Sequence, residues 1–320
     1  MTRIGTIASH SALNILSGAR EESFETVLYM LGNKRRELYE GFGVATEIVE
    51  LDSYDELFDT VDNDVVMIPH GSYVAYLSLD KILNSSLQMF GNKELLMWEA
   101  DRIKKDKLMK DAALKVPHTT EDIEDAHFPC IVKYDGAEGG RGYFVANTKS
   151  EVTERLERNK NASFQQWIVG TKVYATFFNS LVRDRLEFFG TDIRYETDLD
   201  SKIRFDTDYA FQIIGNIPMV LRESLLAPYY EMGVGFTKAV GKSLSHPMIG
   251  PFCLETIIDR NLDIWCFEFS GRIVAGTNLF VPSSPYSYIT FGNTNMWMGR
   301  RIALEIREAK ENGQLDSILV

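Results

Sequence analysis

The chain has 320 residues, of which 45% are hydrophobic and 25% are charged, and its formal net charge is -12. This length can bury a large core in two or three lobes, and the acidic balance excludes a general nucleic-acid binder, whose footprint is a basic surface. The three cysteines have no CxxC spacing, so we expect buried free thiols and a cytoplasmic protein. No signal-peptide pattern and no apolar run of about 18 residues occurs, so neither secretion nor a membrane span is expected.

Short β-like runs alternate with helical patterns in residues 1–92. This rhythm predicts a small parallel α/β domain, in which ligands bind at the carboxyl ends of the strands. The β-like runs cover residues 4–7, 26–30, 46–51 and 65–69.

Two of these predicted strand ends carry a histidine beside a serine. His10 lies between two serines, and His70 is followed by Gly71 and Ser72. Each group can be a capping serine beside a surface histidine, but the N–H groups at a helix start can also hold a phosphate. Two such groups at corresponding ends of one sheet favour a shared ligand.

Residues 93–127 differ in pattern from the preceding segment, because a charged helical stretch is followed by an acidic connection. We interpret them as a linker helix region. The following lobe, residues 128–190, places Lys133 at the end of an apolar run before a glycine-rich loop. The loop can bring its backbone N–H groups against an anion, although an ordinary mobile hairpin has the same pattern. Its glycines are Gly136, Gly139, Gly140 and Gly142.

Two glutamates occupy apolar β-like runs in the last segment, residues 191–320. Glu255 and Glu268 are 13 residues apart across a turn, so antiparallel pairing would place their carboxylates side by side. Two buried like charges stay ionised only with a cation between them, and Mg²⁺ suits this place because it bridges carboxylates to phosphate oxygens. The alternatives are that a glutamate points to solvent, shares a proton, or pairs with Arg272.

The order of these features resembles the ATP-grasp ligases, and more closely the archaeal synthetases of FAICAR, 5-formamidoimidazole-4-carboxamide ribonucleotide. The implied fold is mixed α/β, α+β overall, with a parallel N-terminal domain before two ATP-grasp lobes. The resemblance extends over nearly the whole chain. The shared segments include residues 8–13, 90–93, 133–143, 214–218, 221–226, 250–255, 267–270, 272–278, 284–286 and 299–303.

The resemblance implies an ATP-dependent ligase of de novo purine (IMP) biosynthesis. Its reaction would formylate AICAR, the 5-aminoimidazole-4-carboxamide ribonucleotide, with formate through formyl phosphate. The implied partners are therefore AICAR, formate and ATP, without nucleic acid or membrane. Family precedent suggests a homo-oligomer such as a hexamer.

The resemblance also implies roles for individual residues of this sequence. His10, Ser72 and Asn216 would bind AICAR. Lys133 and the loop glycines would cover the ATP phosphates, and Glu196 would contact ATP. The adenine hinge would consist of Gln165, Gln166, Trp167 and Ile168.

The metal and catalytic roles fall on four positions. Glu255 and Glu268 would bind Mg²⁺ or Mn²⁺. Lys133 and Arg272 are the catalytic candidates, and for Arg272 the reason is charge, because a guanidinium group suits a carboxylate or an acyl phosphate.

The sequence departs from the family around the expected nucleotide site. Asp135 stands where the family commonly has a histidine, and the segments before Gln165 and between Glu196 and Asn216 are shorter. An ATP-grasp ligase for another carboxylate or amine, or a non-catalytic nucleotide-binding protein, therefore stays open.

Overall fold

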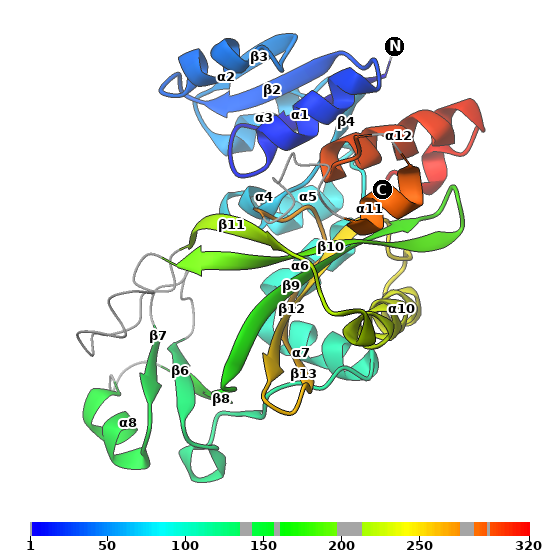
Figure 1. Cartoon of the computed structure of the whole chain (residues 1–320). Coiled ribbons are helices and arrows are strands. Elements are labelled where there is room, and N and C mark those ends of the chain that lie inside the picture. Colours follow the sequence, from blue (N-terminus) through cyan, green and yellow to red (C-terminus); the bar gives the residue numbers. More distant parts are fainter. Residues whose placement is uncertain (1, 135–142, 157–160, 197–212, 276–284, 293–294) are drawn as a thin grey trace.

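The computed structural model describes the chain apart from residues 1, 135–142, 157–160, 197–212, 276–284 and 293–294. Its described part contains one parallel and two antiparallel sheets. In Figure 1 the parallel sheet lies at one end of the molecule, the smaller antiparallel sheet at the other, and a five-stranded antiparallel sheet between them. The predicted mixed α/β class is confirmed.

The N-terminal sheet is parallel and has the strand order β3-β2-β1-β4. Its strands are β1 (Arg3–Ile7), β2 (Thr26–Leu31), β3 (Glu47–Leu51) and β4 (Val65–Met67). The connecting helices are α1 (Ala12–Glu21), α2 (Arg36–Phe42), η1 (Tyr54–Glu56) and α3 (Leu57–Thr60). The chain adds β2 and β3 on one side of β1 and then β4 on the other, so the switch point of the sheet, where ligands bind in such folds, lies between β1 and β4.

The charged stretch that we expected to form one linker helix forms two. After α4 (Gly71–Tyr76) and α5 (Leu79–Asn84) come α6 (Lys93–Ala100) and α7 (Arg102–Asp111). Asp101 separates them because its backbone is extended and its carboxylate accepts hydrogen bonds from the backbone N–H groups of Ile103 (2.9 Å) and Lys104 (3.0 Å). An N-cap of this kind begins a new helix.

The smaller antiparallel sheet has the order β5-β8-β6-β7. It consists of β5 (Thr119–Thr120), β6 (Cys130–Tyr134), β7 (Tyr143–Ala146) and β8 (Ala162–Gln166), with η2 (Ile123–Asp125) and α8 (Lys149–Arg155) beside it. Val132, Phe144, Val152 and Phe164 form its core. The predicted glycine-rich loop, with Asp135, joins β6 to β7 and lies outside the described residues.

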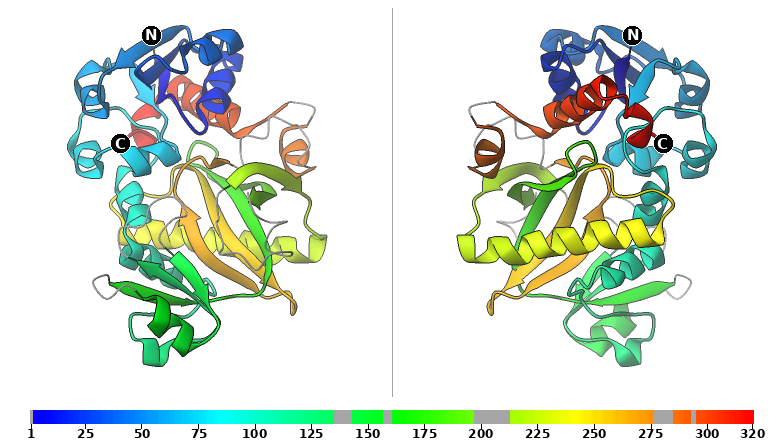
Figure 2. Two further views of the ribbon diagram at one scale, coloured as in Figure 1. Left: turned by 90° about the vertical axis from the view of Figure 1, so that its left-hand side faces the viewer. Right: turned by 90° about the vertical axis from the view of Figure 1, so that its right-hand side faces the viewer.

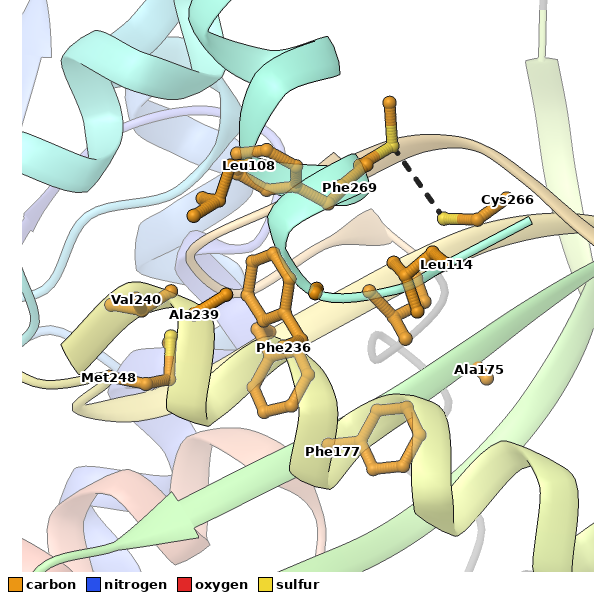
Figure 3. Packing of buried hydrophobic residues seen from close by; sticks show 14 of the residues in the cluster. Leu108, Leu114, Ala175, Phe177, Phe236, Ala239, Val240, Met248, Cys266 and Phe269 are labelled. Atoms are coloured by element: carbon orange, nitrogen blue, oxygen red, sulfur yellow. Dashed lines mark hydrogen bonds between the residues drawn. The ribbon is translucent and has the colours of Figure 1, made fainter. Parts of the chain in front are cut away.

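The central sheet is antiparallel, with the order β11-β10-β9-β12-β13. Its strands are β9 (Gly170–Ser180), β10 (Arg185–Glu196), β11 (Ile213–Met219), β12 (Gly250–Asp259) and β13 (Ile264–Ser270). Helix α10 (Leu226–Ser243), which follows η3 (Glu223–Leu225), crosses one face of this sheet (Figure 2). Phe177 and Phe269 of the sheet pack there against Phe236 of α10 and Leu108 of α7 (Figure 3).

The two faces of the central sheet differ because side chains alternate along a strand. Val173, Ala175 and Phe177 face the apolar core under α10. Tyr174 and Thr176 therefore face the other way, toward the side on which the polar residues of β10, β12 and β13 also lie.

The end of the chain returns to the N-terminal domain. Helix α11 (Pro285–Phe291) is followed by α12 (Met298–Glu311) and η5 (Leu315–Ser317), and α12 lies beside α1 (Figure 1). Gly18 and Gly299 allow this approach, because a Cβ atom at Gly18 would lie 2.1 Å from the backbone nitrogen of Arg300. The domain limits at residues 92, 127 and 190 stay a prediction.

Two expectations from composition can be compared with the structure. Cys130, Cys253 and Cys266 are buried free thiols, as predicted. Among the described helices, none is both long and apolar enough to cross a membrane.

Candidate active site

Two histidines meet at the switch point of the parallel sheet. The rings of His10 and His70 are stacked, with centroids 5.6 Å apart and planes 7° from parallel. His70 is fully buried, and its Nε2 lies 3.0 Å from the carbonyl oxygen of Ile7 while its Nδ1 accepts a hydrogen bond from the backbone N–H of Ser72 (3.2 Å). This pairing requires the neutral tautomer with the proton on Nε2, and burial accordingly lowers the pKa of His70 to about 4. His70 is thus the cap of α4, not a surface histidine.

His10 is the member of this pair that is open to solvent. Its backbone is left-handed (φ 45°), and its Nδ1 lies 2.7 Å from Oγ of Ser11. The side chain of Ser11 therefore contacts His10 and does not cap α1, contrary to the capping interpretation. A Cβ atom at Gly71 would lie 3.0 Å from Nε2 of His10, so glycine leaves room for the ring. His10 and Ser72 lie together, as predicted from their strand ends.

The segment after β13 connects the central sheet to this histidine pair. Ile273 forms a β-bridge with His70. The neighbouring Arg272 donates from Nη2 to Glu99 Oε1 (2.6 Å) and from Nη1 to the carbonyl oxygen of Ile273 (3.2 Å), and Glu99 also accepts from the N–H of Gly271 (2.9 Å). Arg272 pairs with Glu99, a residue that the sequence did not single out, and not with the strand glutamates.

The two strand glutamates lie side by side, as predicted. Glu255 of β12 and Glu268 of β13 occupy directly opposite positions. Glu255 is buried, accepts from Oγ of Ser270 (3.2 Å) and lies 3.5 Å from Nη1 of Arg194, whereas the half-exposed Glu268 pairs with Lys105 of α7 (2.5 Å). Burial raises the pKa of Glu255. Burial acts in the same direction on Glu268, but Lys105 outweighs it and lowers the pKa of Glu268 to about 2.

This pair fits a hard divalent cation. Two carboxylates at adjacent strand positions supply the oxygen ligands that Mg²⁺ prefers. The described residues contain no group of three or more His, Cys, Asp or Glu side chains placed to hold a metal. Water and phosphate oxygens would fill the other positions, which is the usual arrangement for Mg²⁺ bound with a nucleotide.

Three cations surround Glu268. Lys133 at the end of β6 donates from Nζ to Gln165 Oε1 (2.8 Å). Burial lowers the pKa of Lys133 to about 8, and the charge of Glu268 opposes that effect while Arg102 and Lys105 add to it. Lys105 contacts Glu268 directly, and the charges of Lys133 and Arg194 also act on its carboxylate. An excess of positive charge at this place suits phosphate. The sequence did not identify Arg102 or Lys105 as candidate site residues.

The predicted adenine hinge continues β8. The N–H of Gln166 donates to the carbonyl oxygen of His118, and that of Trp167 to the carbonyl oxygen of Pro129, both at 2.8 Å. The hinge is therefore fixed to the chain before β6, and Gln165 links it to Lys133. Its predicted members are Gln165, Gln166, Trp167 and Ile168.

Glu196 and Asn216 lie on the two strands at the other side of the central sheet. Glu196 is buried at the end of β10 and pairs with Lys172 of β9. Asn216 of β11 donates from Nδ2 to the carbonyl oxygen of Ala275 (3.1 Å), while its buried Oδ1 has no hydrogen-bond partner among the described residues. An unpaired buried acceptor at a predicted ribonucleotide residue is consistent with a ligand donor there.

A row of polar residues crosses the face of the central sheet that lies opposite α10. Asp192, Tyr174, Glu255 and Glu268 are directly opposite one another on successive strands, from β10 to β13. Arg194 follows Asp192 on the same face, and its guanidinium carbon lies 3.7 Å from the centroid of the Tyr174 ring. The sequence signal for Arg194 and Asp192 was their alternation with Glu196, which places all three on one face.

Asp192 gives a first prediction, for stability. It is 2% exposed, and burial raises its pKa to about 7. The charge of Glu255 also raises this pKa, whereas the charge of Arg194 lowers it. A raised carboxyl pKa means that stability is lost as pH rises from about 4 to about 7. Asp192→Asn lacks this titration, so relative to wild type it should gain up to ~3 kcal/mol between pH 4.5 and 8.

Urea denaturation at both pH values measures that gain. Asp59→Asn, at an exposed position of α3, is the matched control and should show no such pH dependence. An Asp192→Asn advantage that stays constant or shrinks with pH contradicts the prediction.

Several predicted positions lie outside the described residues. They are Asp135, Gly136, Gly139, Gly140 and Gly142, together with Asn278 of the shared segment 272–278.

Comparison with solved structures defines the class of protein. The chain superposes on N5-carboxyaminoimidazole synthetase from Staphylococcus aureus with a TM-score of 0.66 at 16% identity, covering 86% of this chain and 72% of that one. The biotin carboxylase domain of 2-oxoglutarate carboxylase from Hydrogenobacter thermophilus gives a TM-score of 0.67 at 13% identity, covering 95% and 70%. The chain has the ATP-grasp fold.

Sequence comparison defines the family. The chain is 42% identical to the 5-formaminoimidazole-4-carboxamide ribofuranosyl monophosphate synthetase of Saccharolobus solfataricus, over 99% of both chains. The IMP biosynthesis protein PurP from Thermococcus kodakaraensis has a TM-score of 0.85 at 30% identity, with coverage of 99% and 100%. Models described as a protein of unknown function (DUF1246) and a domain of unknown function (DUF1297) match residues 4–120 and 146–320. The chain belongs to the FAICAR synthetase family.

Proposed function

We propose that this protein is an ATP-dependent carbon–nitrogen ligase that joins formate to the 5-amino group of AICAR, giving FAICAR, ADP and phosphate in IMP biosynthesis. The observation that carries the proposal is the polar face of the central sheet, opposite α10. The carboxylate pair Glu255 and Glu268, which contacts Arg194 and Lys105, shares this face with Asn216, the direct strand neighbour of Arg194. Full-length similarity to synthetases of this name supports the same reaction.

The nucleotide side of the site would hold ATP with Mg²⁺ or Mn²⁺. Glu255 and Glu268 would bind the metal, which when bound would neutralise charge on the phosphates. Lys133 would contact the phosphates together with the glycine-rich loop, and Glu196 and the hinge would hold the nucleoside. Two proteins of the same fold, the synthetase from Staphylococcus aureus and the biotin carboxylase domain from Hydrogenobacter thermophilus, were solved with ADP and with MgADP.

The reaction would proceed in two balanced steps. A formate oxygen attacks the γ-phosphorus of ATP, the bond to the ADP oxygen breaks, and formyl phosphate forms. The amino nitrogen of AICAR then attacks the formyl carbon, phosphate leaves with the electron pair of the C–O bond, and the amine loses a proton. His10, Ser72 and Asn216 would hold AICAR for the second step, and Lys133 and Arg272 would offset negative charge.

Two further parts of the proposal have separate grounds. Free cysteines support a location in the cytoplasm, and family precedent supports assembly as a homo-oligomer such as a hexamer.

An ADP-release assay with one substrate omitted at a time tests the proposed function. ADP should appear with ATP, formate and AICAR together, and FAICAR should form in equal amount by chromatography. Turnover that requires another carboxylate in place of formate would point to a different ligase. Binding of ATP without ADP release under any combination would exclude catalysis.

A further inference from the structure

Arg194 lies between the two halves of the site. Its Nη1 is 3.5 Å from Oε2 of Glu255, on the metal side. On the other side it is the direct strand neighbour of Asn216, and its charge contributes to lowering the pKa of His10. A group in this position faces both the proposed ATP phosphates and the proposed ribonucleotide.

The side chain of Arg194 is fixed but incompletely bonded. It stacks on Tyr174 at 3.7 Å, and 12% of its side chain is exposed. Its buried Nε has no hydrogen-bond partner among the described residues, and the contact of Nη1 with Glu255 is at the long limit of a hydrogen bond. A buried donor without an acceptor costs ~1–3 kcal/mol, so an acceptor supplied by a ligand would stabilise this arrangement.

Arg272 is bonded differently. Its buried Nε also has no hydrogen-bond partner among the described residues, but both of its terminal nitrogens donate within the protein, Nη2 to Glu99 (2.6 Å) and Nη1 to the carbonyl oxygen of Ile273 (3.2 Å). Its guanidinium therefore holds the segment after β13 in place. Arg194 has the weaker internal bonding and is the better placed of the two to bind an anion.

We infer that the Nε edge of Arg194 binds the small carboxylate co-substrate, which is formate if the proposed function holds. Guanidinium groups bind carboxylates through two parallel N–H···O bonds, a geometry that a lysine cannot reproduce. Tyr174, on which Arg194 stacks, packs with Cys253 and Val274, and these three residues are almost fully buried. Dense packing on this side of the guanidinium favours a carboxylate with little or no side chain.

The position explains how one anion can take part in both steps. A carboxylate on Arg194 would lie beside Glu255, where the metal and the γ-phosphate are proposed, and beside Asn216, where AICAR is proposed. Arg194 would orient the carboxylate, and it would neither gain nor lose a proton in either step.

The test compares Arg194→Met and Arg194→Lys with wild type in steady-state kinetics for all three substrates. Loss of a charge-assisted contact of ~1.5–3 kcal/mol predicts that Arg194→Met raises the KM for formate roughly 10- to 150-fold. Arg194→Lys should fall between wild type and Arg194→Met, because it keeps the charge but not the paired donors. Dissociation constants for ATP and AICAR, measured by calorimetry without formate, should stay within about threefold, since the lost contact is to neither.

Arg36→Met is the matched control, because Arg36 is an exposed residue of α2 with surface ion pairs to Glu40 and Glu50. An unchanged KM for formate in Arg194→Met, or in Arg194→Lys where the methionine variant does not fold, overturns the inference. So does a loss of AICAR affinity that accounts for the whole effect. Wild-type protein without formate-dependent turnover would instead refute the proposed function, and the two failures are therefore distinguishable.

Discussion

Glu268→Gln is expected to lower formate-dependent ADP release by roughly three orders of magnitude, because a bound metal contributes several kcal/mol of charge stabilisation. Glutamine has nearly the same shape as glutamate but no charge. The substitution removes one of two opposed carboxylates and leaves Lys105 without its partner. Phosphoryl transfer should therefore fail although the fold is kept.

Two measurements separate loss of metal from loss of structure. Mn²⁺ titration followed by electron paramagnetic resonance should show weakened binding in Glu268→Gln, while circular dichroism should match wild type. Glu50→Gln, at an exposed position of β3, is the control and should leave both readouts unchanged. Full activity of Glu268→Gln in the presence of Mg²⁺ would remove the metal assignment.

The carboxylate pair and the histidine pair could be predicted because each depends on a short-range rule. Glu255 and Glu268 flank a single turn, so their spacing determines that they face each other across two strands. His10 and His70 follow strands of one parallel sheet, whose carboxyl ends lie at the same edge. Local pattern and sheet geometry were sufficient for both.

The contacts of Lys105, Arg272 and Arg194 in the site could not be predicted in this way. Lys105 is one of several lysines in the helical stretch that became α7, and only the rotation of that helix against β13 selects it as the partner of Glu268. Glu99 and Arg272 are 173 residues apart in sequence. Arg194 becomes part of the site through the register of β10 with β9 and β11. Each of these contacts is tertiary. Alternation along β10 indicates the face on which Arg194 lies, but no local signal in the sequence identifies the partners of these residues.

The second large effect is expected at Arg301, in a buried ion network far from the site residues in sequence. Arg301 is fully buried on α12 and pairs with Glu187 of β10 (2.7 Å) and Glu305 of α12 (2.9 Å). Its guanidinium carbon lies 4.2 Å from the centroid of the Phe178 ring. The network joins the helix that packs on α1 to the central sheet, so it helps to hold the two together.

Arg301→Met should lower the free energy of unfolding by ~3–5 kcal/mol, because it leaves the buried carboxylate of Glu305 uncompensated, whereas Glu187 keeps its ion pairs with Arg185 and Arg183. Glu305 is 1% exposed and would retain only neutral donors among its described partners, Oγ of Ser180 and the N–H of Val182. Urea denaturation followed by circular dichroism measures the loss. Arg307→Met is the control on the same helix, since that side chain is 44% exposed and its ion pairs should contribute less than ~1 kcal/mol.

A double variant separates charge from packing at this position. If the uncompensated carboxylate of Glu305 causes the loss, Arg301→Met/Glu305→Gln should be more stable than Arg301→Met, because the buried charge is gone while the volume is nearly the same. If both variants are equally unstable, the missing contacts of the guanidinium with Phe178 and its neighbours cause the loss. In that case the van der Waals contacts of Arg301, and not its ion pairs, stabilise the packing of α12 against the central sheet.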